Sequence, residues 1–270
     1  MANLIAALLA VTLYLSCTVL LMMRLRGSNT AAILSKPVIL VPGFLGLGAH
    51  LYTLSTSMMS PIGINIGFFT ALSLVCAFIA MFTLVSALRH PIEILGIIVL
   101  PIAALTMAAD LATSSVHLLP PGSPGGLIFH VVSSIIAYSI LGLAALLAIV
   151  LSIQNRFLHR HQPGGLIRLL PPLKTMESLL FDAIIIGFIC LSVSLISGMV
   201  FLEDMFAQHL AHKTILSILA WLVFATLLIG RWLFGWRGLT AIRWTLVGFV
   251  SLMLAYFGSK FVLELILSTP

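Results

Sequence analysis

The chain has 270 residues, of which 61% are hydrophobic and only 7% are charged, and its mean hydropathy is +1.23. This composition excludes a soluble globular domain and predicts an integral membrane protein. The net charge of +6 calls for no nucleic-acid partner, because basic residues at the ends of membrane spans account for it.

Apolar runs of about 20 residues, long enough to cross roughly 30 Å of hydrocarbon, follow one another along most of the chain. Eight are predicted as membrane-spanning helices, at about 2–23, 32–54, 64–88, 92–113, 126–153, 178–202, 213–234 and 241–265. They leave little sequence for a separate soluble domain. We therefore predict an all-α polytopic bundle that forms a single integral membrane domain over residues 1–270.

The basic residues predict the orientation of these spans. When the spans alternate across the bilayer, Lys213 and Lys260 are the only two of the 13 Lys and Arg residues that fall on one side. Because Lys and Arg remain on the cytoplasmic side, we expect both termini to be extracytoplasmic. The first span has Arg24 and Arg26 after its apolar core and no basic residue before it, which favours a retained span over a signal peptide.

Two further segments are assigned to structural roles. The segment at about 154–177 mixes proline, glycine and basic residues and is predicted as a basic cytoplasmic loop that lies on the anionic leaflet. In the sixth span Gly187, Ser194 and Gly198 share a helical face, as expected where two membrane helices approach closely. The three cysteines lie within spans without a CxxC or CxxCH motif, which argues against covalently attached haem.

Two histidines are predicted near the outer membrane face, on different helices. His130 lies four residues after Gly126, about 6 Å into its helix, and His50 lies at a similar depth in the second span. Neutral histidine is the commonest metal ligand, and two can hold a haem iron axially. Ser134 and Tyr138 follow His130 on the same helical face, where their hydroxyls are expected to orient a ligand or a water.

The seventh span adds a cation and an aromatic plane at the same outer side. His212 and Lys213 begin it, and Ser217 and Trp221 share a face below them. The alternative for each histidine is a hydrogen bond to a neighbouring helix with no ligand. No thiol is near, so a closed structural zinc site is not expected. The acids at this edge, Asp110, Glu203 and Asp204, are interpreted as solvated loop charges.

Several of these stretches carry a resemblance to a known family. The chain resembles the cytochrome c assembly membrane proteins of the CcsA, CcmC and HemX type, in particular their YpjD-like inner-membrane branch. The matching segments are INIGFFTALSL, RHPIE, HVVSSIIAYSIL, HKTILSILAWLVFATLLIGRWLFGWRG and LAYFGSKFVLELI. The specific parts are the His130-Ser134-Tyr138 face and the interval from Lys213 to Trp221.

The resemblance implies haem handling at the outer face of the bacterial inner membrane, in support of c-type cytochrome assembly with other maturation proteins. It implies that His130 is an axial ligand of haem b and that His50 is its leading partner, with Trp221 covering the macrocycle and Lys213 beside a propionate. The chain departs from the family in the segment FLEDMFAQHLAHK, which keeps Lys213 but contains no tryptophan. Haem delivery and an accessory or regulatory haem-binding role therefore both remain open.

Two other readings stay beside this one. A transporter for a metal ion or a small solute would need ionisable groups at the bilayer midplane. Most of the charged residues are predicted near the span ends, and Asp110 and Asp182 are the only acids that this alternative could use. A membrane subunit that binds a protein partner without haem is the other alternative. No nucleophile or general base stands out in the sequence, so we expect a non-catalytic protein.

Overall fold

The computed structural model describes residues 2–26, 35–60, 63–113, 118–119, 124–159, 170–201 and 211–258. Eight helices within these ranges are long and apolar enough to cross a membrane, which confirms the prediction of an all-α polytopic bundle. Lipid offers no partner for backbone N–H and C=O groups, so apolar runs of this length fold as helices that satisfy those groups internally. The predicted extracytoplasmic position of both termini stays a prediction.

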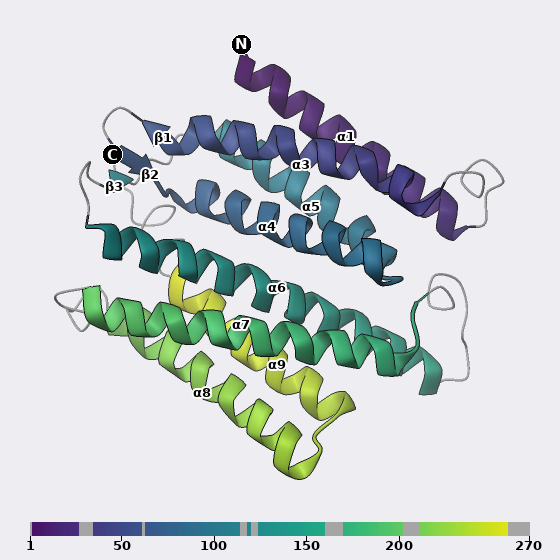
Figure 1. Ribbon diagram of the computed structural model, residues 1–270, viewed down its shortest axis with the longest axis vertical. Coiled ribbons are helices and arrows are strands. Elements are labelled where there is room, and N and C mark those ends of the chain that lie inside the picture. Colours follow the sequence, from purple (N-terminus) through teal and green to yellow (C-terminus); the bar gives the residue numbers. More distant parts are fainter. Residues whose placement is uncertain are drawn as a thin grey trace. The chain divides into compact units, whose positions relative to one another are not determined.

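The described helices fall into two compact units. Unit 1 contains α1 (Ala2–Leu25), α3 (Lys36–Met58), α4 (Phe68–Arg89) and α5 (Glu93–Ala112), drawn in purple and blue in Figure 1. Within it α1 packs on α3 and α5, and α4 packs on α3 and α5. The expectation of a single domain stays a prediction, and each unit is described by itself.

Glycines allow α1 and α3 to approach closely. A Cβ atom added at Gly46 would lie 3.1 Å from Tyr14 Cδ1 and 3.3 Å from the Ala10 carbonyl oxygen, and one at Gly43 would lie 3.0 Å from Cys17 Sγ. Small residues at helix contacts are the usual way for membrane helices to gain van der Waals contact, because lipid provides no hydrophobic driving force between them.

A small antiparallel sheet closes one end of unit 1. Its strands, in the order β1-β2-β3, are β1 (Met59–Ser60), β2 (Gly63–Asn65) and β3 (Leu118–Leu119). Ile64 pairs with Met59 on one side and with Leu119 on the other. The prediction of residue 64 as part of the third span was wrong, because strands of two or three residues are too short to show an alternating pattern in the sequence.

Unit 2 contains α6 (Gly125–His159), α7 (Leu173–Phe201), α8 (Ala211–Phe234), α9 (Gly238–Met253) and the short π-helix η2 (Leu254–Gly258), drawn from teal to yellow in Figure 1. Helix α6 packs mainly on α7 and also on α9, while α8 packs on α7 and α9. In the most apolar part of α6, 72% of the residues are buried, whereas the share is 50% or less in each of the other described spans. Helix α6 is therefore the central helix of this unit.

The loop predicted at 154–177 is shorter in the structure, because the two long helices of unit 2 extend into both of its ends. Helix α6 continues to His159 and α7 already begins at Leu173, so both ends of that segment are helical. Residues 160–169 lie outside the described residues. The reason for the difference is that Arg156 and other polar residues past the apolar core are good helix formers, and a helix does not have to end where its hydrophobic run ends.

The predicted small-residue face of the sixth span is confirmed at Gly187 and Ser194. A Cβ atom added at Gly187 would lie 2.6 Å from Leu141 Cδ2 of α6, and Ser194 is buried with its Oγ atom 2.6 Å from the Oγ atom of Ser134. We expect Gly187→Ala to lower the free energy of unfolding by about 1–3 kcal/mol, because the added methyl group overpacks the α6–α7 contact.

Thermal denaturation in mild detergent checks this prediction, with Gly48→Ala as the matched control. No atom lies within 4 Å of a Cβ atom at Gly48, so that variant should melt at or slightly above the wild-type temperature. Equal melting temperatures for the two variants would contradict the assignment of Gly187 to a tight helix contact.

Candidate functional site

The imidazole of His130 is anchored on α7 through one of its two nitrogens. Its Nδ1 atom lies 2.9 Å from the backbone oxygen of Ser194 and 3.3 Å from the Oγ atom of Ser197. A backbone carbonyl only accepts hydrogen bonds, so Nδ1 carries the proton and donates it. In the neutral ring the lone pair then resides on Nε2, for which no hydrogen-bond partner is found among the described residues.

This arrangement is the one that metal-ligating histidines normally adopt. One ring N–H is donated to a carbonyl or carboxylate, which sets the tautomer and the ring orientation, and the other nitrogen binds the metal. His130 is half-buried and lies in the second turn of α6. The site therefore offers one preoriented imidazole nitrogen.

Hydroxyl groups surround the anchoring side of His130. Ser134 donates to the His130 carbonyl at 2.7 Å and lies 2.6 Å from Ser194 Oγ. Ser197 donates to the Ser194 carbonyl at 2.8 Å, which leaves its own oxygen lone pairs able to accept from His130. These serines join α6 to α7, so Ser134 stands beside His130 as the sequence indicates, but its hydroxyl is occupied by the helix contact.

Ser194 and Ser197 contact His130 although neither is predicted from the sequence as a binding residue. Ser194 is predicted only as a packing residue. Their i, i+3 spacing on α7 puts both on one face, beside the buried Gly198. The sequence shows that the two serines share one face of their helix. It does not show that this face packs on the helix that carries His130, because that contact is a property of the fold.

Tyr138 is committed to another contact of unit 2. Its side chain is buried, and its hydroxyl donates to the Leu252 carbonyl of α9 at 2.6 Å. The rings of Tyr256 and Phe257 pack edge-on against it with centroid distances of 6.0 Å. The structure thus uses Tyr138 to tie α6 to the junction of α9 and η2.

His50 differs from His130 because both of its ring nitrogens are engaged. In unit 1 its side chain is fully buried, with Nε2 2.8 Å from Ser73 Oγ and Nδ1 3.3 Å from the Tyr14 hydroxyl. The Tyr14 ring also meets the imidazole edge-on, with centroids 5.9 Å apart. This node connects α1, α3 and α4. A metal would reach His50 only after one of these hydroxyls had moved away.

The predicted residues of the seventh span lie in α8. The Trp221 indole N–H donates to Ser192 Oγ at 2.8 Å, and its ring stacks on Phe188 of α7 with centroids 5.3 Å apart. His212 is exposed in the first turn of α8, and the half-buried Lys213 follows it. No group of three or more His, Cys, Asp or Glu side chains in the described ranges is placed to hold a metal ion.

One acid interpreted as a solvated loop charge is placed differently by the structure. Asp110 lies in the last turn of α5, half-buried, and accepts a hydrogen bond of 2.6 Å from Thr70 of α4. The interpretation as a solvated loop charge was wrong, because Asp110 lies within α5 and its carboxylate is bound by the Thr70 hydroxyl of α4. Glu203 and Asp204 lie outside the described residues.

Comparison with known proteins identifies similar chains. The sequence model of the family "Cytochrome C assembly protein" matches residues 38–267. The Inner membrane protein YpjD of Escherichia coli (strain K12) is 29% identical over 245 residues, which is 89% of each chain. A 28.8 kDa protein from the nifR3-like 5' region of Azospirillum brasilense is 31% identical over 200 residues, 72% of this chain and 73% of its own length.

A more distant relative is the Cytochrome c biogenesis protein CcsA of Chlamydomonas reinhardtii. It is 28% identical over 149 residues, which is 54% of this chain and 41% of its own length. No solved structure gives a significant match.

The different anchoring of the two histidines predicts different costs of removing them. His50→Ala should lower the free energy of unfolding by about 2–4 kcal/mol, since it opens a cavity and leaves the buried hydroxyls of Tyr14 and Ser73 without their partner. His130→Ala should cost less than about 1.5 kcal/mol, because the Ser194 carbonyl keeps the Ser197 hydroxyl as a donor.

Chemical denaturation of the two purified variants, followed by circular dichroism, measures this difference. A greater loss of stability for His130→Ala than for His50→Ala would show that His130 is the packing residue and would reverse the assignment.

Proposed function

The chain belongs to the Cytochrome C assembly protein family, and from this premise we propose that it is a haem-binding protein of the bacterial inner membrane in which His130 supplies an axial ligand. Its membership makes it a membrane protein of cytochrome c assembly. The inner-membrane location agrees with the printed name of YpjD, its relative over 89% of the chain. The protein partners expected for it are other maturation proteins of c-type cytochromes.

One observation carries the proposal for His130. Its Nδ1–H is donated to the Ser194 carbonyl, so the Nε2 lone pair is free of described partners and preoriented. Haem b supplies an iron whose axial positions accept neutral imidazole. The residues present therefore fit one axial ligand, and this chain's part is to hold the imidazole in one tautomer and one orientation.

The second axial ligand stays a prediction. His50 is the candidate that the sequence indicates, and its hydrogen bonds to Ser73 and Tyr14 support a packing role. Binding of iron by His50 requires that the Ser73 hydroxyl leave Nε2. His212 belongs to the same unit as His130 and is exposed at the start of α8, and it is the further imidazole that we include in the test.

The remaining predicted residues are proposed to bind the macrocycle and its edges. Trp221 presents an aromatic plane that Phe188 and the Ser192 hydroxyl hold in one orientation. Lys213, eight residues earlier on the same helix, supplies a positive charge for a propionate. Ser134 and Tyr138 support the site from α6 by fixing that helix on α7 and α9. This role is coordination and binding, and we propose no catalytic step.

Visible absorption spectra of the oxidised and dithionite-reduced protein, purified in mild detergent from haem-replete cells, test the proposal. We expect a Soret band with sharp reduced α and β bands in the wild type, and at least a tenfold loss of bound haem in His130→Ala. His50→Ala and His212→Ala identify the second ligand by the same loss.

The matched control is His159→Ala. His159 is an exposed histidine in the last turn of α6 whose Nδ1 lies 3.0 Å from its own helix at Asn155 O, so its removal should leave the spectrum unchanged. A colourless wild type, or a His130→Ala variant with a wild-type spectrum, would refute haem binding at His130. Those results would favour a protein-binding subunit or a metal-ion or small-solute transporter.

A further inference from the structure

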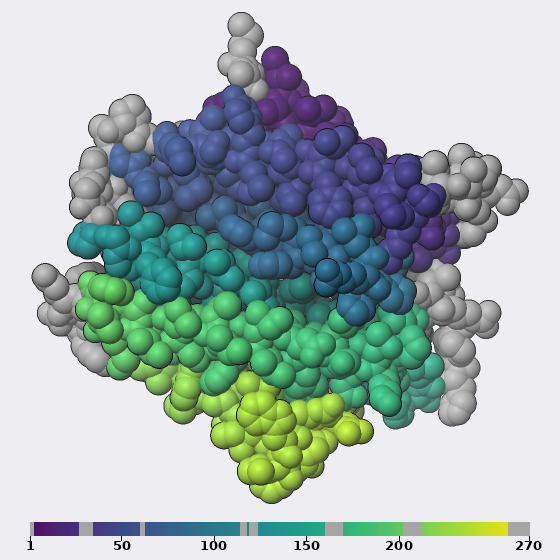
Figure 2. Space-filling model, in the orientation of Figure 1, coloured from purple at the N-terminus to yellow at the C-terminus, as the bar shows by residue number. Residues whose placement is uncertain are grey.

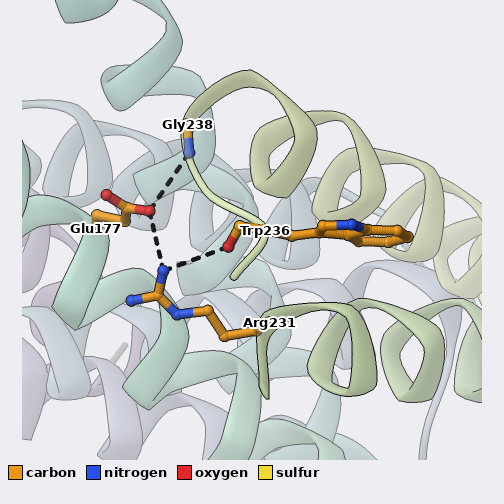
Figure 3. A network of polar contacts seen from close by, with 4 residues as sticks. All are labelled: Glu177, Arg231, Trp236 and Gly238. Carbon is orange, nitrogen blue, oxygen red and sulfur yellow. Dashed lines mark hydrogen bonds and ion pairs between the residues drawn. The ribbon is translucent and has the colours of Figure 1, made fainter. Parts of the chain in front are cut away.

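The turn that joins α8 to α9 is held in place by a polar network (Figure 3). The Arg231 guanidinium lies 3.5 Å from the Glu177 carboxylate of α7 and donates to the Trp236 carbonyl at 3.3 Å. The backbone N–H of Gly238 donates to the same Glu177 oxygen at 3.3 Å. The Glu177 carboxylate thus binds both ends of the turn, and its negative charge is paired with Arg231 within unit 2.

The backbone of the turn is built to keep this shape. Gly235 and Gly238 adopt φ angles of +67° and +55°, which side chains other than glycine rarely tolerate. The Trp236 N–H donates to the Gly230 carbonyl at 3.1 Å, and the Trp236 ring packs on Trp244 with centroids 5.5 Å apart. The turn is therefore a rigid element with Arg231 and Trp236 directed inward.

The side chains that this turn directs outward are large and apolar. Trp232, Leu233 and Phe234 are 70%, 73% and 73% exposed, and Figure 2 shows the segment that joins α8 to α9 on the surface of unit 2. Tryptophan at the end of a membrane span is typical of the boundary between acyl chains and headgroups. This end of unit 2 is therefore placed at the level of the lipid headgroups.

Unpaired positive charge lies at the same end. Arg237 and Arg243 are exposed, as is Lys174 near the start of α7, and none of them has a hydrogen-bond or ion-pair partner among the described residues. Glu177 is already bound to Arg231. Asp182, the next acid along α7, is five residues further into the span. Arg243 lies about 9 Å along α9 from Arg237, a distance that its long side chain covers by snorkelling to the interface.

We propose that this rigid turn is a binding site for the headgroup of an anionic phospholipid. Arg237 and Arg243 contact the headgroup phosphate, and Trp232, Leu233 and Phe234 lie among the adjacent acyl chains. The positive charge of this end of unit 2 is complementary to an anionic headgroup, since Arg237, Arg243 and Lys174 outnumber the exposed acid Asp182 among the described residues. The Glu177–Arg231 pair preorganises the turn, so binding needs little ordering of the backbone.

Native mass spectrometry of the full chain, released from nanodiscs of mixed phosphatidylglycerol and phosphatidylcholine, tests the proposal. The wild type should retain phosphatidylglycerol in preference to phosphatidylcholine. Each arginine near an anionic surface contributes roughly fivefold to binding, so Arg237→Gln with Arg243→Gln should reduce that preference about 25-fold. The conservative pair Arg237→Lys with Arg243→Lys should retain most of it.

The matched control is Arg26→Gln with Arg89→Gln, which removes two exposed arginines from helix ends of unit 1. Circular dichroism and gel filtration select variants that fold like the wild type. The proposal is upheld when only the turn variant loses the lipid. An equal loss of phosphatidylglycerol in the turn variant and in the control variant would show a general effect of charge and would overturn the site. A wild type that retains phosphatidylglycerol no better than phosphatidylcholine would overturn it as well.

Discussion

Lipid offers no hydrogen bonds, and this constraint explains how several polar side chains of the described spans are placed. The buried imidazole of His50 contacts Tyr14 and Ser73, the Tyr138 hydroxyl contacts the Leu252 carbonyl, and the Trp221 indole contacts Ser192. Each of these contacts joins two different helices. These polar groups therefore act as ties between helices, in addition to the close packing of small residues.

The ring of His130 differs from these side chains because one of its two nitrogens has no hydrogen-bond partner among the described residues. Its Nδ1 atom donates to the Ser194 carbonyl, while Nε2 has no described partner. A nitrogen left unpaired in an apolar environment costs free energy unless a ligand compensates it. The same reasoning makes His50 a packing residue in this structure, since hydroxyl groups engage both of its ring nitrogens.

The sequence alone was sufficient for the membrane class, the eight spans, the family resemblance and the helical face that His130 shares with Ser134 and Tyr138. These follow from features that are local along the chain. Apolar runs of about 20 residues specify spans, and the spacing of His130, Ser134 and Tyr138 specifies one helical face. It also contained the small-residue face of α7, because Gly187 and Ser194 recur at helical spacing.

Only the tertiary structure decided which atoms of those residues are already occupied. The partner of His130 lies 64 residues away and that of Tyr138 lies 114 residues away, distances over which no periodicity carries information. The same holds for the short strands that pair Ile64 with Leu119 and for the contact of Asp110 with Thr70. Sequence determines which side chains share a helix face, whereas the packing of one helix on another determines which lone pairs remain available to a ligand.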